Sequence, residues 1–267
     1  MKLTNSNYYG PKANKEYFSV SQYKDFLDCP ARALATARGE YKSPMTEAML
    51  IGSYIDSYFE GELNKFKKEH PEIFNSRTGE LKAAYQRAND IIKRCEADDL
   101  FMEYVTGSKQ VIMTAEMFGA PWKIKMDVYR KDERIVDLKI IRSLERIMGI
   151  SFIEFWGYDT QMAVYSEVER IFTKRENNLS TYLAVATKED TTDIDIIHIP
   201  HWRREECLAD VGKNMPRLIA YKSGELEAPG CGVCAYCKQN KKLKAPTEFE
   251  YVGFSNKDLA LMEGKIF

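Results

Sequence analysis

The chain has 267 residues, of which 44% are hydrophobic and 30% are charged, a composition typical of a soluble globular protein with one well-filled core. Its 39 Lys and Arg residues nearly balance its 40 Asp and Glu residues, so the net charge of −1 gives no overall attraction to nucleic acid, and any phosphate-binding surface must be local. No apolar run approaches the about 20 residues that cross a bilayer. The polar first residues also lack the apolar core of a signal peptide. We therefore expect a cytoplasmic protein with no membrane contact, whose six cysteines are reduced, buried or metal-bound.

Helical patterns dominate the first hundred residues. Residues 1–18 are expected to form a loose arm. A helix-start signal follows at Ser19 or Ser21, and Pro30 should end or kink the helix that begins there. A second helix is expected over residues 46–60, and a mostly helical stretch leads from it to the first strand.

Gly52 and Asp56 lie four residues apart on one face of that second helix. A glycine in a helix interior costs about 1 kcal/mol relative to alanine. Close approach of another backbone, or of a ligand, beside Asp56 would explain the glycine. An incidental glycine beside a surface aspartate explains it equally well.

Three strands are expected next. The first covers residues 111–118. In the second, over residues 122–129, apolar and polar side chains alternate with the period of a half-buried strand. The third, over residues 135–140, is apolar except for Asp137 and Lys139, which project together from one face.

Asp127 and Asp137 stand on neighbouring predicted strands, and Lys139 lies beside one of them. Charged side chains on the outer face of a sheet are usually solvated. A strand as apolar as this third one is typically covered on both faces, however, and a carboxylate there is costly unless it is paired or bound to metal. The pattern indicates a compact acidic pocket that holds a divalent metal ion and activates water.

The remaining elements complete the fold class. A helix is expected over residues 155–174, strands over residues 182–187 and 194–199, and a last helix over residues 203–221. This order predicts an α/β fold with a mixed central β-sheet flanked by helices.

Taken together, these residues resemble the PD-(D/E)XK nuclease superfamily, in particular its RecB-type branch of phage and bacterial recombination exonucleases. Asp127 followed by Asp137-Leu138-Lys139 matches the D…(D/E)xK core, and Gln161-Met-Ala-Val-Tyr165 matches the QxxxY motif on the following helix. Glu116 fits an additional acidic position on the preceding strand. A DxK sequence alone is common by chance, whereas DxK followed about twenty residues later by QxxxY is far more specific.

The resemblance implies a restriction-endonuclease-like core with an N-terminal helical elaboration, and a Mg²⁺- or Mn²⁺-dependent deoxyribonuclease. Asp127, Asp137 and the main-chain carbonyl of Leu138 would hold the metal. Asp56 and Glu116 would complete this site or help to form a second one. Asp56 stands where many relatives have a histidine, and a carboxylate in its place can still bind a hard cation.

The resemblance also gives roles to the remaining motif residues. Lys139 would position the attacking water and offset the charge that builds on the phosphate. Gln161 and Tyr165 would orient the substrate or the lysine. Judged without the resemblance, the latter two also fit an ordinary helix face with Tyr165 in the core.

Cys231, Cys234 and Cys237 form a Cys-x-x-Cys-x-x-Cys sequence, a dense spacing of metal ligands in a reduced protein. A structural zinc ion or an iron–sulfur cluster requires a fourth ligand. By resemblance to certain RecB-type nucleases, Cys29 supplies it, so that a [4Fe–4S] cluster joins the C-terminal end to the N-terminal helix. Zinc, or a family remnant with free thiols, is the alternative.

The resemblance further implies a DNA exonuclease similar to the exonuclease VIII and lambda exonuclease group. Such enzymes resect the ends of double-stranded DNA in phage-type recombination, and they pass single strands to an annealing protein. Most are ring-shaped oligomers, so a homo-oligomer is expected. The alternatives are a single-strand exonuclease or endonuclease of the iron–sulfur RecB-type group, or an inactive DNA-binding relative.

The expected organisation is one nuclease domain over residues 1–240 and a tail at 241–267. Within the domain, residues 18–107 form a helical N-terminal part and residues 108–200 form the catalytic core of sheet and helix. Residues 201–240 carry the C-terminal helix and the cysteine motif.

Overall fold

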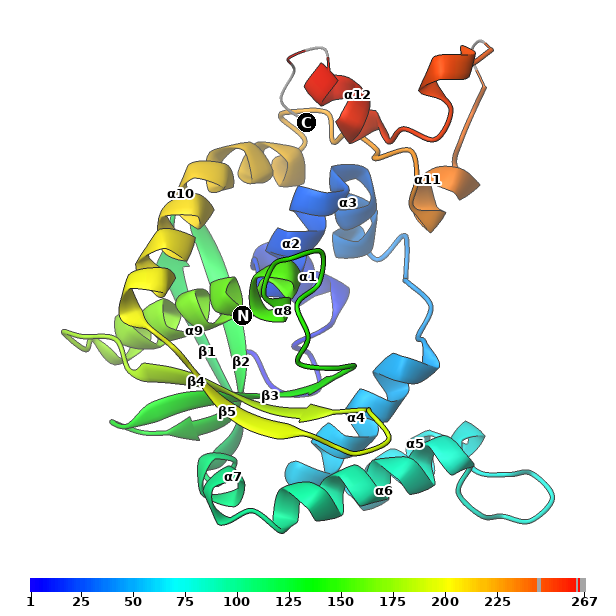
Figure 1. The fold of residues 1–267 in the computed structure, drawn as a ribbon. Coiled ribbons are helices and arrows are strands. Elements are labelled where there is room, and N and C mark those ends of the chain that lie inside the picture. The colour runs from blue at the N-terminus through cyan, green and yellow to red at the C-terminus, as the bar shows by residue number, and fades with distance from the viewer. Residues whose placement is uncertain (244–245, 263, 265–267) are drawn as a thin grey trace. The chain divides into compact units, whose positions relative to one another are not determined.

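A computed structural model describes residues 1–243, 246–262 and 264 of the chain (Figure 1). The chain forms two compact units, each made of segments that are distant in sequence. Unit 1 consists of Met1–Ser43, Glu116–Lys123 and Asp210–Phe267, and unit 2 consists of Pro44–Ala115 and Ile124–Ala209. The single domain over residues 1–240 stays a prediction, and part of the tail expected at 241–267 lies outside the described residues.

A five-stranded mixed sheet has the strand order β1-β2-β3-β4-β5. Strands β2 and β3 are antiparallel, β3 and β4 are parallel, and β4 and β5 are antiparallel. The parallel pair requires a crossover, which helices α8 and α9 provide. The strands span Ser108–Met117 (β1), Ala120–Arg130 (β2), Arg134–Ile141 (β3), Ser180–Thr187 (β4) and Ile194–Ile199 (β5). The predicted mixed sheet flanked by helices is confirmed.

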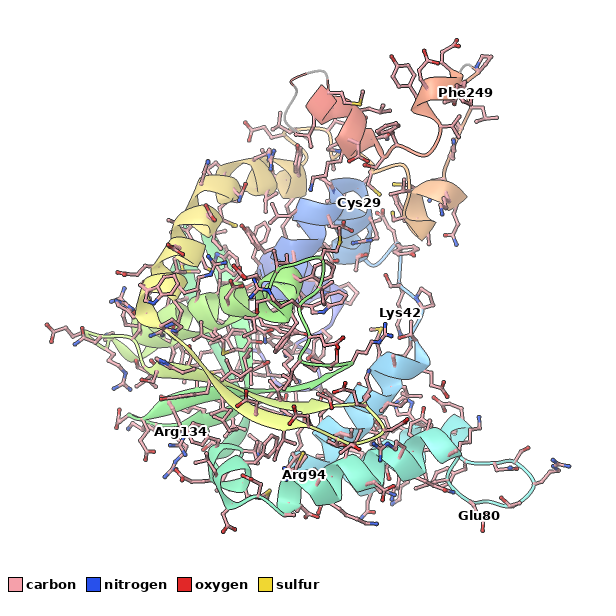
Figure 2. All side chains as sticks on the ribbon, viewed as in Figure 1. Cys29, Lys42, Glu80, Arg94, Arg134 and Phe249 are labelled. Carbon is pink, nitrogen blue, oxygen red and sulfur yellow. The ribbon has the colours of Figure 1, made fainter. Side chains whose placement is uncertain are left out.

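Helices of unit 2 pack on both faces of its strands (Figures 1 and 2). On one face, residues of α4, α6 and α7 form a core with Val136 and Leu138 of β3. On the other, Phe152 of α8 and Met162 of α9 pack on strands β3 to β5. The helical segments are α4 (Glu47–Phe59), α5 (Leu63–Glu69), η1 (Pro71–Ile73), α6 (Ala83–Glu96), α7 (Asp99–Tyr104), α8 (Phe152–Trp156) and α9 (Tyr158–Thr173).

The helix expected over residues 155–174 is interrupted. Gly157 adopts the left-handed conformation with φ of 62°, which ends the short helix α8 and starts α9 in a new direction. The helical periodicity continues across this position, so it gave no sign of the break.

In unit 1, Ser19 caps α2 by accepting a hydrogen bond from the backbone N of Gln22 at 3.3 Å, which confirms the predicted helix start. Pro30 ends this helix and opens the next, so Cys29 stands at the junction between them. The segments of this unit are α1 (Pro11–Glu16), α2 (Val20–Asp28), α3 (Pro30–Arg38), α11 (Ala235–Gln239), η2 (Phe249–Tyr251) and α12 (Asn256–Met262), together with the second half of α10 (His201–Ser223).

The prediction of a loose arm over residues 1–18 is wrong, because this segment packs in unit 1. Tyr8 and Ala13 are buried, and the arm surrounds the side chain of Lys123, which is only 1% exposed. The Lys123 ammonium group donates to the carbonyl of Tyr8, and to Oδ1 of Asn14 at 2.7 Å. The arm is ordered because it satisfies a buried cation.

Within the described part of the chain, none of the helices combines the length and the apolar composition that a membrane span requires.

Candidate active site

Three aspartates from three elements of unit 2 surround one lysine. Asp56 comes from α4, Asp127 from β2 and Asp137 from β3, which also carries Lys139. Oδ2 of Asp127 accepts a hydrogen bond from the backbone N of Leu138 at 3.1 Å, so the carboxylate of β2 is fixed against β3. The charges of Asp127, Asp137 and Lys139 all act on Asp56. The predicted acidic pocket therefore exists as a cluster of side chains.

Asp137 and Lys139 form an ion pair on the face of β3 that α9 covers. Asp137 is 1% exposed. Its Oδ1 atom accepts a hydrogen bond from Nε2 of Gln161 at 2.6 Å, which links the DxK and QxxxY motifs directly. The ring of Tyr158 lies 5.2 Å from the Lys139 ammonium group. Sequence reasoning missed Tyr158, although it precedes Gln161 by three residues on the same helix and so shares its face.

The electrostatics of the cluster are dominated by burial of negative charge. Burial raises the pKa of Asp56 well above its usual value, and the charge of Asp127 raises it further against the opposing effect of Lys139. Burial likewise raises the pKa of Asp137. For Lys139, burial alone would lower the pKa, but the charges of Asp137 and Asp127 outweigh it and raise the value, so the lysine stays protonated. Lys139 thus acts on all three carboxylates, and a second partly buried lysine, Lys109, acts on Asp127 and on Glu60.

An unsatisfied oxygen also indicates room for a positive ion. Among the described residues, Oδ1 of Asp56 is buried and has no hydrogen-bond partner. A buried carboxylate oxygen without a partner is costly unless a cation or water reaches it. Carboxylate and carbonyl oxygens are the ligands that Mg²⁺ and Mn²⁺ prefer. Asp56, Asp127, Asp137 and the carbonyl of Leu138 supply donors of this type. Among the described residues, their carboxylate oxygens are not drawn together as closely as the four cysteine sulfur atoms are.

A second layer of residues, which sequence reasoning also missed, supports Asp127. Gln110 of β1 donates from Nε2 to Oδ1 of Asp127 at 3.2 Å and also to Glu60 of α4. Gln110 has a positive φ of 53°, a costly conformation for a residue other than glycine. Glu60 is the C-cap of α4 and follows Asp56 by four residues, and this spacing could have identified it.

The two remaining predicted site residues lie in different units. Tyr165 is partly buried and packs against the core cluster that contains Met162 and Leu183. Glu116 is exposed on the part of β1 that belongs to unit 1, where its charge acts on Tyr17. Among the described residues, it takes no part in the hydrogen bonds of the acidic cluster, and its predicted role stays a prediction.

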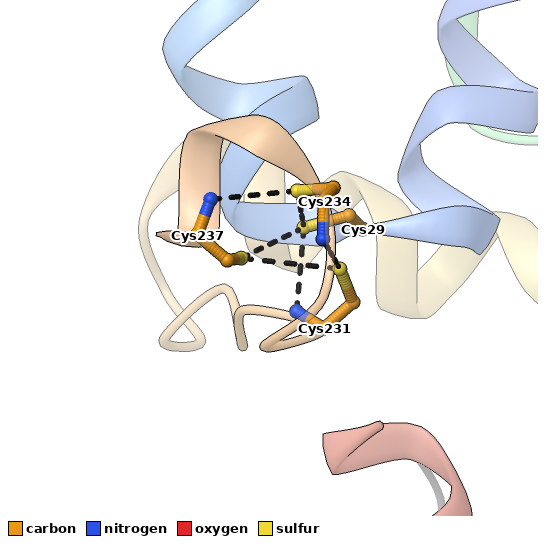
Figure 3. A group of neighbouring side chains, drawn as sticks. All are labelled: Cys29, Cys231, Cys234 and Cys237. Atoms are coloured by element: carbon orange, nitrogen blue, oxygen red, sulfur yellow. Dashed lines mark hydrogen bonds between the residues drawn. The ribbon is translucent and has the colours of Figure 1, made fainter. Parts of the chain in front are cut away.

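The four predicted cysteine ligands come together in unit 1 (Figure 3). Their sulfur atoms all lie within 4.8 Å of one another. Cys29 Sγ is 3.6 Å from that of Cys237 and 3.8 Å from that of Cys234. Backbone N–H groups of Cys231, Cys234 and Cys237 point at sulfur atoms of the group, as is usual around metal-bound thiolates.

The backbone around the cysteines leaves little room for side chains. A Cβ atom added at Gly230 would lie 3.0 Å from the sulfur of Cys237. Gly232 has a φ of 82°, and a Cβ atom there would lie 2.9 Å from Asn256. The glycines let the loop wrap closely around the four sulfur atoms. The remaining cysteines, Cys95 and Cys207, are buried elsewhere.

Comparison with known proteins agrees with this arrangement. A family model described as a PDDEXK-like domain of unknown function (DUF3799) matches residues 19–240. The crystal structure of a candidate exonuclease from Eubacterium rectale is 44% identical, covers 95% of this chain and 98% of that chain, and has a TM-score of 0.90. The crystal structure of SSO0001 is 13% identical over 85% of this chain and 96% of that chain, with a TM-score of 0.32. A search of curated proteins found no match. The chain belongs to the family of PDDEXK-like domains, as the resemblance to the PD-(D/E)XK superfamily predicted.

Proposed function

We propose that this protein is a metal-dependent deoxyribonuclease that hydrolyses phosphodiester bonds from the ends of double-stranded DNA. The observation that carries the proposal is the cluster of Asp56, Asp127 and Asp137 around Lys139, in which Asp137 is buried and the other three are partly buried. A binding module or scaffold would gain nothing from three neighbouring carboxylates that are partly or fully buried, because each raises the free energy of the others.

The cluster assigns a role to each residue. Asp127, Asp137, the carbonyl of Leu138 and Asp56 would hold Mg²⁺ or Mn²⁺. When bound, such an ion polarises the scissile phosphate and lowers the pKa of a water molecule. Lys139, which remains protonated, holds that water in place by a hydrogen bond and compensates the charge that builds on the phosphate.

The neighbouring residues keep this geometry. Gln161 orients Asp137 through its 2.6 Å hydrogen bond, and it therefore acts on the Asp137–Lys139 pair rather than on the DNA. Gln110 orients Asp127 in the same way from the other side. Tyr165 supports the helix that carries Gln161, and Glu116 contributes to metal or DNA binding.

End resection in phage-type recombination is the role that we propose for this activity. It rests on the nuclease activity, which the family membership and the similarity to the candidate exonuclease from Eubacterium rectale support. In this role the protein is cytoplasmic, forms a homo-oligomer and passes single strands to an annealing protein.

One experiment with three DNA substrates separates this proposal from its alternatives. Linear duplex labelled at one 5′ end, closed circular duplex and single strands are incubated with the protein in Mg²⁺, with an Asp137→Asn variant as control. Exonuclease activity releases label or shortens the linear duplex progressively and leaves the closed circle intact. Cleavage of the circle indicates an endonuclease, and digestion of single strands alone indicates a single-strand exonuclease. Binding without hydrolysis of any substrate contradicts the proposal.

We further propose that Cys29, Cys231, Cys234 and Cys237 hold a structural metal centre that joins the α2–α3 junction to the segment before α11. The sulfur separations of 3.6 Å and 3.8 Å match the edge of a tetrahedron around one zinc ion, which is about 3.8 Å for Zn–S bonds of about 2.3 Å. A [4Fe–4S] cluster binds each thiolate at a different corner of a cube and holds the sulfur atoms farther apart. Zinc is therefore favoured, and the iron–sulfur cluster is the alternative.

A further inference from the structure

The acidic cluster opens into a cleft of about 900 Å³ within unit 2. Asp56, Leu138 and Lys139 line one end of it. One wall is α4, and the other is formed by α8 and the loop that joins β3 to α8 (Figure 1). Anything that reaches the cluster through this cleft must pass between the two walls.

The second wall presents aromatic rings to solvent. Trp156 is 52% exposed and Phe155 is 38% exposed, and both line the cleft. Their rings stand edge to face with centroids 4.9 Å apart. The helix that carries them is anchored in the core by Phe152, which is 6% exposed. Exposing a tryptophan leaves a large apolar surface in water, which is unfavourable unless a ligand covers it.

The same wall is basic. Arg142 and Arg146 of the loop line the cleft, as does Glu145 of the same loop, and Lys188 lines it from the turn between β4 and β5. Nε of Arg146 donates to the carbonyl of Gly149 at 2.8 Å, which holds this loop in shape. Asp56 lies on the wall formed by α4, whereas Arg142 and Arg146 lie on the wall formed by α8 and its loop. A polyanion can bind the wall while one of its phosphates reaches the metal ligands.

The opposite wall contains Gly52, one turn before Asp56 on α4. A Cβ atom added at Gly52 would meet no other atom within 4 Å, so no neighbouring element requires the glycine. The open space removes close approach of another backbone as a reason for the glycine, and Gly52 leaves this part of the cleft wall free of a side chain.

We propose that this cleft binds a single, unpaired DNA strand, with nucleobases stacked on Trp156 and Phe155 and phosphates held by Arg142 and Arg146. Inside a duplex both faces of each base are covered by its neighbours, so two aromatic rings that line a cleft can stack on successive bases only when these have left the helix. The inference rests on the proposed nuclease function and gives its substrate at the cluster: a strand separated from its complement before hydrolysis.

The test measures binding without hydrolysis, in EDTA, by fluorescence anisotropy of a labelled 12-nucleotide single strand and of a blunt hairpin duplex. Trp156→Ala should weaken single-strand binding by about 5- to 150-fold, the range for loss of one stacked base. Trp156→Phe should restore most of it. Phe172→Ala, which removes a ring that is 53% exposed on α9 outside the cleft, should change nothing. Quenching of 2-aminopurine in the strand should fall with Trp156→Ala.

A second pair of variants examines the phosphate contacts. Arg142→Ala and Arg146→Ala together should lower the salt dependence of single-strand binding and leave 2-aminopurine quenching at saturation unchanged. The proposal is overturned if wild-type protein does not bind the single strand. It is also overturned if Trp156→Ala leaves binding of the single strand unchanged, or weakens binding of the single strand and of the duplex to the same extent. The nuclease proposal fails separately, when wild-type protein hydrolyses no DNA in Mg²⁺ whatever the binding result.

Discussion

Gln161 of α9 donates a 2.6 Å hydrogen bond to Asp137 of β3, and the same carboxylate is paired with Lys139. Two motifs that lie 24 residues apart therefore meet at one carboxyl group. Oδ1 of Asp137 is occupied by the glutamine, and Oδ2 faces the lysine. Rotation of the carboxylate would break both contacts, so Gln161 controls the direction from which Asp137 can bind a metal ion.

Gln161→Ala should therefore reduce hydrolysis of linear duplex DNA by about 10- to 100-fold, the usual effect of removing a group that orients a metal ligand. The concentration of Mg²⁺ at half-maximal rate should increase as well, because Asp137 loses its fixed orientation. Steady-state rates over a Mg²⁺ titration measure both quantities. Gln161→Met, which keeps the length of the side chain and has no donor for the carboxylate, should behave like Gln161→Ala. A rate and a metal requirement equal to those of wild type would show that the hydrogen bond has no positioning role.

Asp137→Asn should abolish hydrolysis and leave the fold intact. The substitution keeps the size of the side chain and removes a charge that burial disfavours, as the raised pKa of Asp137 indicates. The substitution also leaves Lys139 without its ion-pair partner, which offsets this gain. The melting temperature without metal should therefore stay close to that of wild type. Activity assays and thermal unfolding followed by circular dichroism test the two expectations. Unchanged hydrolysis would remove Asp137 from the catalytic residues.

Mg²⁺ and Mn²⁺ should stabilise the wild-type protein against unfolding, because the ion binds the folded cluster and not the separated side chains. At an ion concentration of about 100 times the dissociation constant, the free energy of unfolding should increase by about 2.7 kcal/mol. Asp56→Asn should reduce this stabilisation, since Oδ1 of Asp56 is a buried oxygen with no other partner in the described structure. Thermal unfolding with and without the ion gives the difference.

Glu116→Gln in the same experiment tests its predicted part in metal binding. If Glu116 completes a metal site, the stabilisation by Mg²⁺ should decrease as it does in Asp56→Asn. Full stabilisation in Glu116→Gln together with full activity would exclude this role.

Cys234→Ser should remove the metal centre of unit 1 and lower the melting temperature, because the cluster joins two segments about 200 residues apart in sequence. Metal analysis of protein purified without oxygen should find one zinc per chain in wild type and little in the variant. Cys95→Ser, at a buried cysteine outside the group, is the control for general destabilisation and should retain the metal. Iron with a brown colour would identify the alternative cluster, and a wild-type protein free of both metals would contradict the proposed centre.

Lys222 makes stability depend on pH. Burial lowers its pKa to about 7, and the charge of Lys123 adds to the effect. In the unfolded chain a lysine keeps its proton up to about pH 10.4. Between these values the unfolded state binds more protons, so the free energy of unfolding increases with pH over this window.

Lys222→Met should remove this contribution, although it also loses the hydrogen bonds to the carbonyl of Tyr17 and to Oε1 of Gln22. Relative to wild type, the variant should be most stable near pH 6 and lose this advantage toward pH 10. Urea unfolding at several pH values gives the difference in the free energy of unfolding between the variant and wild type. Lys213→Met, at an exposed position of α10, is the control. A difference between variant and wild type that is constant with pH would show that Lys222 remains protonated.

Several features were predictable because they depend on neighbours within one element. The alternation around Asp127 and the apolar run around Asp137 and Lys139 indicated two strands with charged groups at particular positions. The spacing of Gln161 and Tyr165 placed both on one helix face. The motif order then identified the superfamily, and the mixed sheet followed from the order of elements.

Tertiary structure decided how those elements meet. Periodicity shows which residues share a face, but not which face of another element lies opposite, so the contacts Gln161–Asp137 and Gln110–Asp127 could not be predicted from sequence. The same limit hid the burial of Lys123, which reads as the polar side of a strand until the N-terminal arm covers it. The sequence by itself determined the chemical groups and the strands and helices that carry them. Only the fold decided which charges are buried together, because burial depends on side chains that are distant along the chain.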